Sequence, residues 1–240
     1  MARSPMHYHA YRDDMAATPA MQLGTAVHRA VLDGELPVVY PGAVRRGKAW
    51  EQFQADHVND NIVTESESHK IMGMCASVQA HPEAMRVLKG ERERYIEWTY
   101  QGRAVRSTPD VIGDGFVTDL KTTVNADPER FKWDAVRRLY HAQLAFYAEA
   151  VRSSGLGEPR QAYIVAVESS APYAVSVLRL TPDALDIGGR LCHQWMEQVR
   201  ACEAANHWPG YSDAIVDLDC GGDDVELTFS AETLEAAEIY

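Results

Sequence analysis

The first third of the chain repeats apolar residues at the spacing of helices. Thr18 and Pro19 have the pattern of an N-cap followed by a first helical residue, and Thr64 and Glu67 form a capping box. These patterns predict helices over 18–34, 46–57 and 64–81, and a short helix that begins at Pro82. The N-terminal third is therefore expected to be helical.

From Glu91 onward, apolar and polar residues alternate as they do in strands. Turn signals at 101–102 and 114–115 divide residues 91–123 into a predicted meander of three strands. Beyond it, the spacing predicts a helical stretch from Asp127, an amphipathic helix over 136–153, strands over 161–169 and 173–180, and a helix over 181–206. The fold class expected from this order is α/β, with a mixed central sheet flanked by helices.

A chain of 240 residues can bury a sizeable core, and we expect a single domain. Its expected parts are a helical N-terminal part (1–89), a catalytic core (90–180), a C-terminal helix (181–208) and an acidic tail (209–240). No apolar run approaches the ~20 residues of a membrane span, and the first residues lack the apolar region of a signal peptide. We therefore expect a cytoplasmic protein without membrane contact.

Charge is distributed unevenly along the chain. The net charge is −12, which argues against a protein that coats nucleic acid through a generally basic surface. Residues 1–140 nevertheless hold 18 basic and 19 acidic residues, whereas residues 141–240 hold 5 and 16. A polyanion could therefore bind only to the first part.

Two carboxylates and one amine are expected to meet near residues 109–121. Asp119 and Lys121 are two positions apart, so they point to the same face of a strand, and the turn at Asp114 can bring Asp110 beside them. Clustered carboxylates repel one another, and a hard divalent cation would compensate them. The alternative is that Asp110 and Asp114 are turn residues and that Asp119 and Lys121 form an ordinary surface pair.

Around these residues the chain resembles the PD-(D/E)XK nuclease superfamily, and within it the branch of RecE-type and RecB-type exonucleases. The resemblance covers roughly residues 4–210. It is carried by GTAVH (24–28), Glu93 in ERERYIEW, Pro109-Asp110, Asp119-Leu120-Lys121 with two threonines after it, and Gln143-x-x-x-Tyr147. Each motif alone is weak, but five of them in this order make a fairly specific signal.

The resemblance implies a metal site. Asp110 and Asp119 would bind the catalytic ion, the Leu120 carbonyl would complete the site, and His28 would be a further ligand. Glu93 would approach a second metal position. The alternatives are that His28 is a satisfied core residue and that Glu93 belongs to a solvated strand edge.

The resemblance also implies roles for three other side chains. Lys121 would orient the attacking water and offset charge on the phosphate in the transition state. Gln143 and Tyr147 share one helix face and would hold the nucleic-acid backbone or the lysine. The alternative is that Tyr147 simply borders the core.

Basic residues near these motifs are candidates for gripping the phosphates of DNA, because phosphate contacts supply most sequence-independent affinity. The candidates are Arg94, Arg103, Arg106, Lys132, Arg137 and Arg138. Each of them could equally be a solvated surface residue.

The resemblance implies a magnesium-dependent exodeoxyribonuclease, with Mn²⁺ as a substitute ion. RecE-like enzymes degrade one strand of linear double-stranded DNA from a 5′ end and form rings around it, as trimers or tetramers. They work with a single-strand annealing protein in phage-type recombination. A ring would turn the balanced region of the chain toward its channel and the acidic region outward.

Two other functions remain open. An iron–sulfur nuclease of the same superfamily would use cysteines, but Cys75, Cys192, Cys202 and Cys220 lack its C-x-x-C element and are expected to be free thiols. The other alternative is a non-catalytic module that binds DNA ends or a protein on a nuclease fold. The joint presence of Asp110, Asp119 and Lys121 argues against that module.

Overall fold

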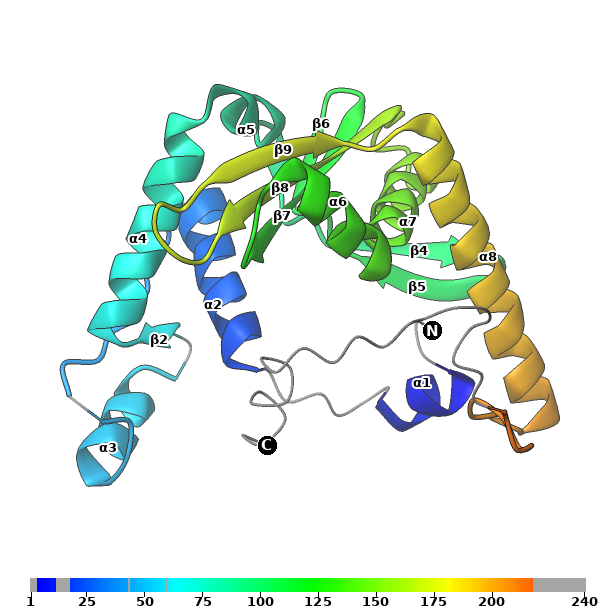
Figure 1. Cartoon of the computed structure of the whole chain (residues 1–240), viewed down its shortest axis with the longest axis horizontal. Helices are drawn as coiled ribbons and strands as arrows, with labels where there is room; N and C mark the ends of the chain where they lie inside the picture. The colour runs from blue at the N-terminus through cyan, green and yellow to red at the C-terminus, as the bar shows by residue number, and fades with distance from the viewer. Residues whose placement is uncertain (1–3, 12–17, 43, 59, 218–240) are drawn as a thin grey trace, which may run out of the picture.

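The computed structural model describes residues 4–11, 18–42, 44–58 and 60–217. A five-stranded sheet with the order β3-β6-β7-β8-β9 forms its centre (Figure 1). The strands are β3 (Glu91–Arg92), β6 (Val111–Gly113), β7 (Phe116–Thr123), β8 (Gln161–Glu168) and β9 (Val175–Arg179). β7 and β8 are parallel and the other neighbours are antiparallel, so the sheet is mixed, as predicted.

Helices from the N-terminal part cover one face of the sheet. They are α2 (Pro19–His28), which continues into a π-helical turn (Arg29–Asp33), α4 (Glu65–Ala80) and α5 (Pro82–Val87). Thr18 caps α2, and Thr64 with Glu67 forms the predicted capping box at the start of α4. The core on this face contains Leu32, Ile71 and Met74, all buried.

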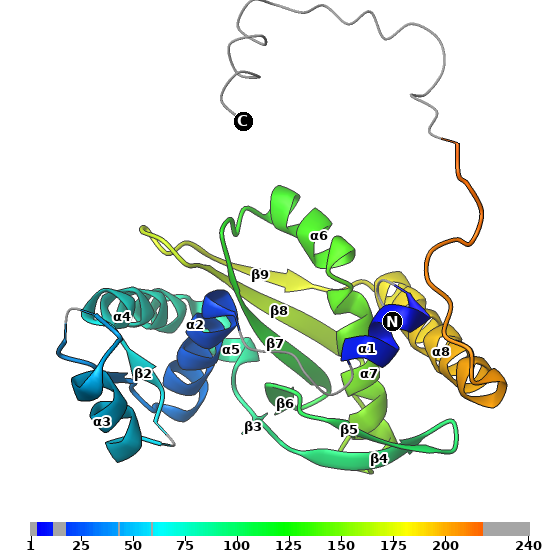
Figure 2. The same cartoon turned by 90° about the horizontal axis from the view of Figure 1, so that it is seen from below.

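The opposite face is covered by α6 (Pro128–Arg137), α7 (Tyr140–Ser153) and a hairpin of β4 (Ile96–Tyr100) and β5 (Arg103–Ser107). This hairpin is a two-stranded sheet of its own, and Figure 2 shows it below β6 and beside α7. Trp98 of the hairpin packs on Phe146 of α7, with ring centroids 4.8 Å apart. The long helix α8 (Pro182–Ala205) lies beside α7.

The predicted three-strand meander is wrong in its pairing. Both predicted turns are present, but the strands on either side of Gly102 pair only with each other, and the hairpin around Gly115 belongs to the central sheet. The physical reason is that Ile96 and Trp98 bury their side chains against α7, which pulls the first hairpin out of the sheet plane. The short β3 takes the place at the edge of the sheet.

The helix predicted over 136–153 is divided. α6 ends at Arg137, and α7 begins at Tyr140 after Leu139, whose φ of 62° lies in the left-handed region. This backbone conformation is strained for a leucine. The break at Leu139 changes the direction of the chain. The turn lets α6 and α7 run in different directions while both pack on this face of the sheet (Figure 2).

Smaller elements lie at the periphery. α1 (Pro5–Tyr11) packs on the end of α8, where the ring of His9 stacks on Trp208 at 4.6 Å. β1 (Val38–Val39) and β2 (Ile62–Val63) form a parallel pair beside α3 (Lys48–Asp56). Among the described helices, none combines the length and the apolar character that a membrane crossing requires. Most of the expected acidic tail, from residue 218, lies outside the described residues.

Candidate metal centre

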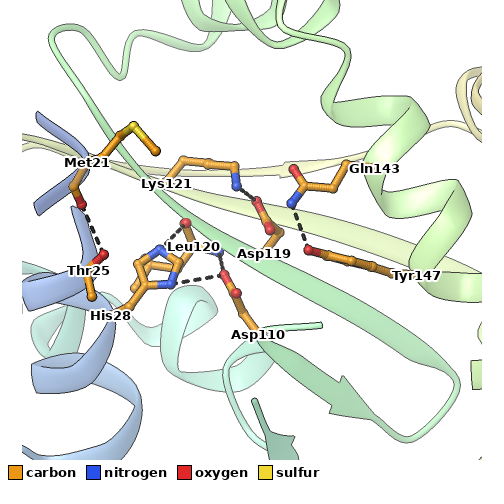
Figure 3. Close-up of polar contacts among 9 residues, drawn as sticks. All are labelled: Met21, Thr25, His28, Asp110, Asp119, Leu120, Lys121, Gln143 and Tyr147. Atoms are coloured by element: carbon orange, nitrogen blue, oxygen red, sulfur yellow. Dashed lines mark hydrogen bonds and ion pairs between the residues drawn. The ribbon is translucent and has the colours of Figure 1, made fainter. Parts of the chain in front are cut away.

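The candidate site lies along the part of β7 that has no neighbouring described strand on one side. β6 pairs only with residues 116–118, so β7 from Asp119 onward faces no described strand on that side. The backbone of Leu120 would be left without partners there. Instead, its N–H donates to Asp110 Oδ2 at 2.7 Å, and its carbonyl oxygen accepts from His28 Nε2 at 2.7 Å (Figure 3). Two polar side chains thus replace the missing strand.

Strand register explains why Asp110 meets Asp119. Val111 pairs with Thr118, so one further step along the two antiparallel strands sets Asp110 opposite Asp119. Alternation places Asp119 on the same face of β7 as Val117, toward α7. Asp110 and Asp119 are only 8% and 1% exposed. The hairpin therefore brings the two predicted carboxylates together in a buried place.

Asp119 and Lys121 form a close ion pair. Lys121 Nζ lies 2.5 Å from Asp119 Oδ2, and the lysine side chain is 19% exposed. Lys121 is the one partner of Oδ2 among the described residues, and Oδ1 accepts no hydrogen bond from any of them. A carboxylate this deeply buried ordinarily accepts several hydrogen bonds. Asp119 therefore has lone pairs free for another partner.

Burial and neighbouring charges set the protonation of these groups. Burial, and then the charge of Asp119, raises the pKa of Asp110. Burial lowers the pKa of His28, which favours the neutral imidazole that metals bind. Burial opposes the charge on Lys121, but the Asp119 carboxylate outweighs it and raises the pKa of the lysine. The lysine is therefore cationic at neutral pH.

His28 reaches the site from the end of α2. Because a carbonyl can only accept, Nε2 carries the proton in the contact with Leu120, and Nδ1 lies 3.5 Å from Asp110 Oδ2. The hydroxyl of Thr25, in the same motif, donates to the Met21 carbonyl at 3.1 Å and so acts within the helix. Of the residues in this motif, His28 is thus the one whose side chain contacts the site.

Gln143 and Tyr147 face the site from α7, as their spacing predicts. Gln143 Nε2 donates to Tyr147 Oη at 2.9 Å (Figure 3). Burial, and then the nearby charges of Asp119 and Asp110, raise the pKa of Tyr147, so the tyrosine remains neutral. The pair therefore places one amide and one phenol beside the carboxylates.

Tyr140 is a site residue that the sequence reasoning missed. Its ring centroid lies 4.9 Å from Lys121 Nζ, within the range of a cation–π contact. Tyr140 precedes Gln143 by three positions and Tyr147 by seven, so all three lie on one helix face. This spacing along the helix was the signal in the sequence that could have identified Tyr140.

Glu93 stands at the exposed rim. Its backbone φ is 46°, and its N–H donates to the Asp110 carbonyl at 3.0 Å. The charge of Glu93 contributes to raising the pKa of Asp110, which shows that its carboxylate is near the site. The structure therefore brings Glu93 close to the other predicted residues without a direct side-chain contact.

The donor set fits a hard divalent cation. It consists of two carboxylates, a backbone carbonyl and an imidazole, and Asp119 Oδ1 has no hydrogen-bond donor among the described residues. Those residues form no cluster of three or more His, Cys, Asp and Glu side chains that would enclose an ion. Mg²⁺ commonly takes one or two carboxylates and completes its shell with water and substrate phosphate. An open site of this kind suits it.

Most of the six basic residues predicted to bind DNA already have acidic partners. Their ion pairs are Arg94 with Glu91, Arg103 with Glu203, Lys132 with Glu129 and Arg137 with Asp134. Arg106 is paired across the hairpin with Glu97 in the strand register. Arg138 makes no ion pair with any residue that the structure describes, and it is exposed. Arg138 is therefore the least neutralised of the six.

The chain is similar to known proteins in sequence and in fold. The model of a family described as "PDDEXK-like domain of unknown function (DUF3799)" matches residues 1–218. No curated protein matches the chain. A crystal structure described as a "putative exonuclease" from Eubacterium rectale shares 14% identity, with a TM-score of 0.62, over 90% of this chain and 82% of that chain.

A second solved structure is more distant. The crystal structure of SSO0001 shares 12% identity, with a TM-score of 0.27, over 57% of this chain and 65% of that chain, and carries no argument. The Eubacterium rectale protein supports the fold alone, since its identity to this chain is low. The assignment of site residues therefore depends on the geometry described above.

Proposed function

This chain belongs to the PDDEXK-like family DUF3799, within the PD-(D/E)XK superfamily, and we propose that it is a metal-dependent nuclease that hydrolyses phosphodiester bonds of DNA. The observation that carries the proposal is the carboxylate of Asp119. It is 1% exposed, its Oδ2 pairs with Lys121, its Oδ1 has no hydrogen-bond partner among the described residues, and Asp110 lies opposite it in the strand register. Buried carboxylate oxygens ordinarily have a hydrogen-bond partner, so the free Oδ1 suits a ligand to an ion.

Each residue has a role in this proposal. Asp110, Asp119 and the Leu120 carbonyl would hold the ion, with His28 as a further ligand and Glu93 near a second position. When bound, the ion supplies Lewis-acid chemistry to the phosphate and the attacking water. Binding through His28 Nε2 requires that nitrogen to give up the proton it now donates to Leu120.

Lys121 acts on the reacting phosphate. Its ammonium is held between the Asp119 carboxylate and the Tyr140 ring, so it has few alternative positions. A fixed cation offsets negative charge as it develops on the phosphate oxygens. Gln143 and Tyr147 would contact the DNA backbone or keep the lysine side chain in place.

The finer form of the proposal is an exodeoxyribonuclease that uses Mg²⁺, or Mn²⁺ in its place, and degrades linear double-stranded DNA from 5′ to 3′. It would act in phage-type recombination together with a single-strand annealing protein. The resemblance of the five motifs to RecE-type enzymes supports this form. The description of the Eubacterium rectale protein as a "putative exonuclease" is in keeping with it.

A homo-oligomeric ring, a trimer or a tetramer, is also part of the proposal. Its support is the division of charge along the chain, which is nearly balanced over residues 1–140 and acidic after them. Multi-angle light scattering of the purified chain at two salt concentrations tests it. The mass of a monomer at both salt concentrations would contradict the proposed ring.

Digestion of a linear duplex is the decisive experiment. Wild type with Mg²⁺ should shorten the duplex, chelator should stop it, and Asp119→Asn and Lys121→Met should each prevent it. Asp114→Asn is the matched control, because Asp114 is an exposed turn residue on the same hairpin. Labels on the 5′ end or the 3′ end of the duplex report polarity.

The non-catalytic module is the alternative that this experiment addresses. Wild type that binds duplex ends but leaves them intact with Mg²⁺ and with Mn²⁺ would favour it.

The iron–sulfur alternative is tested by the visible absorption spectrum of protein purified without oxygen. Cys75 lies on α4, while Cys192 and Cys202 lie on α8.

A further inference from the structure

A cavity opens on the side of α7 next to the candidate metal centre. Its volume is about 480 Å³, far more than the roughly 30 Å³ of one water. It lies among α1, β4, α7 and α8. The six lining residues that matter here are Tyr8, Tyr100, Arg138, Gln143, Phe146 and Trp195. Four of these six residues are aromatic.

Gln143 belongs both to the cavity and to the residues that face the site. Gln143 is one of the residues that line the cavity, and its side chain donates to Tyr147, whose pKa responds to the charges of Asp119 and Asp110. A DNA strand with a phosphate at Asp119 would therefore have a neighbouring nucleotide near Gln143. The cavity lies where the base of such a nucleotide could leave the duplex.

The chemistry of the wall matches a nucleobase. Tyr100 and Phe146 are held edge to face at 5.3 Å, and Phe146 also packs on Trp98, so this wall is rigid. Flat aromatic side chains stack on any base without reading its sequence. Arg138 stands exposed among the lining residues and makes no ion pair with the described part of the chain. An apolar wall beside a free cation suits a base attached to a phosphate.

We propose that this cavity binds an unpaired nucleobase of the DNA strand that is cut at Asp119 and Lys121, with Trp195 as a stacking residue and Arg138 as a phosphate contact. The proposal depends on the proposed nuclease function. It adds that at least one base is taken out of its pair beside the site. A cavity of this kind favours frayed ends and single strands over intact duplex.

The test measures binding without cleavage. A single-stranded oligonucleotide labelled at its 3′ end binds in the presence of chelator, and its affinity is measured by fluorescence anisotropy. A series of oligonucleotides carries one abasic position each, over the nucleotides next to the 5′ end. Wild type should lose about tenfold in affinity at one or two of these positions.

Substitution of the cavity wall should remove that sensitivity. In Trp195→Ala, base removal at the same positions should change affinity less than twofold. In Trp195→Phe, base removal should again lower affinity about tenfold, as in wild type. Tyr8→Ala is the second variant, should Trp195→Ala fold poorly by circular dichroism. Trp133→Ala is the matched control, because Trp133 is 70% exposed on α6 and does not line the cavity. It should keep the tenfold loss.

Three results would overturn the proposal: no position is sensitive to base removal, Trp195→Ala keeps the full sensitivity, or Trp133→Ala loses it. Cleavage is assayed separately with Mg²⁺. Cleavage without base sensitivity contradicts the cavity proposal alone. Base sensitivity without cleavage contradicts the nuclease proposal alone.

Discussion

The Nε2 atom of His28 lies 2.7 Å from the carbonyl oxygen of Leu120, across 92 residues of sequence. This contact joins the end of α2 to the unpaired edge of β7. It makes the position of an N-terminal helix part of the site in the core of the sheet. His28 can be interpreted as a core residue or as a metal ligand. A glutamine at position 28 can replace the hydrogen bond but is a poor metal ligand, so this substitution separates the two interpretations.

We expect His28→Gln to keep the fold and lose metal affinity. The glutamine amide can donate to the Leu120 carbonyl as the imidazole does, but it is a much weaker ligand. The melting temperature in chelator should stay close to that of wild type. The dissociation constant for Mn²⁺, measured by calorimetry, should rise by about tenfold or more. Unchanged Mn²⁺ affinity would favour the core role.

Stability of the metal-free protein should fall as pH rises from 6 to 8. Burial and the charge of Asp119 raise the pKa of Asp110 to about 8, from 3.8. Above the pKa of the unfolded state, the folded state still keeps a proton on Asp110 that the unfolded state has released. The resulting stabilisation of the folded state is present at low pH and is lost as pH approaches 8. The free energy of unfolding, from urea titrations in chelator, should drop by up to about 2 kcal/mol.

Asp110→Asn is the matched variant for this pH dependence. Asparagine can still accept from the Leu120 N–H, but it has no proton to lose. The fall in stability between pH 6 and pH 8 should shrink in this variant. An equal fall in both proteins would assign the pH dependence to another group.

Lys121→Met should destabilise the metal-free protein and abolish cleavage. It leaves the buried Asp119 carboxylate without its cation, a loss of about 3 kcal/mol for a buried pair. Mg²⁺ should restore most of this loss, since the ion compensates the same carboxylate. Urea titrations with and without Mg²⁺ measure it.

Lys132→Met is the control for that substitution. Lys132 pairs with Glu129 at the surface of α6, where an ion pair contributes less than about 1 kcal/mol. Its stability should not respond to Mg²⁺ differently from wild type. A Lys121→Met protein as stable as the control in chelator would mean that Asp119 is already neutral.

Tyr140 should act through Lys121 as a positioning residue. Tyr140→Phe keeps the ring below the ammonium, whereas Tyr140→Leu removes a contact of about 0.5–2 kcal/mol. The leucine variant should lose roughly twofold to thirtyfold in kcat, with little change in KM, and the phenylalanine variant should remain close to wild type. An equal loss in both variants would point to the hydroxyl instead.

Arg138 should contribute more to DNA affinity than Arg103. Arg103 already makes two hydrogen bonds to Glu203, at 2.8 and 2.7 Å, which tie β5 to α8. Arg138→Ala should lower affinity for DNA in chelator and reduce the slope of log affinity against log salt by about one. Arg103→Ala should leave this slope unchanged. The opposite result would mean that the Glu203 pair opens when DNA binds.

The sequence by itself determined the local elements and the short-range part of the site. Capping residues predicted the starts of α2 and α4, runs of strand-forming residues between turn signals predicted β7 and β8, and the spacing of two put Asp119 and Lys121 on one face. These features depend on neighbours within a few positions, where backbone periodicity is decisive. The order of motifs also indicated the family, which the match over residues 1–218 shows.

Only the tertiary structure decided which elements share a layer and which atoms lack partners. The sequence could not show that Ile96 and Trp98 would draw the first hairpin onto α7, or that the chain would turn at Leu139. It could not show that β6 is too short to pair with Leu120. Each outcome depends on packing between distant segments, whose free energy no local pattern contains. The proposed metal centre exists because His28, Asp110 and β7 meet at that unpaired edge.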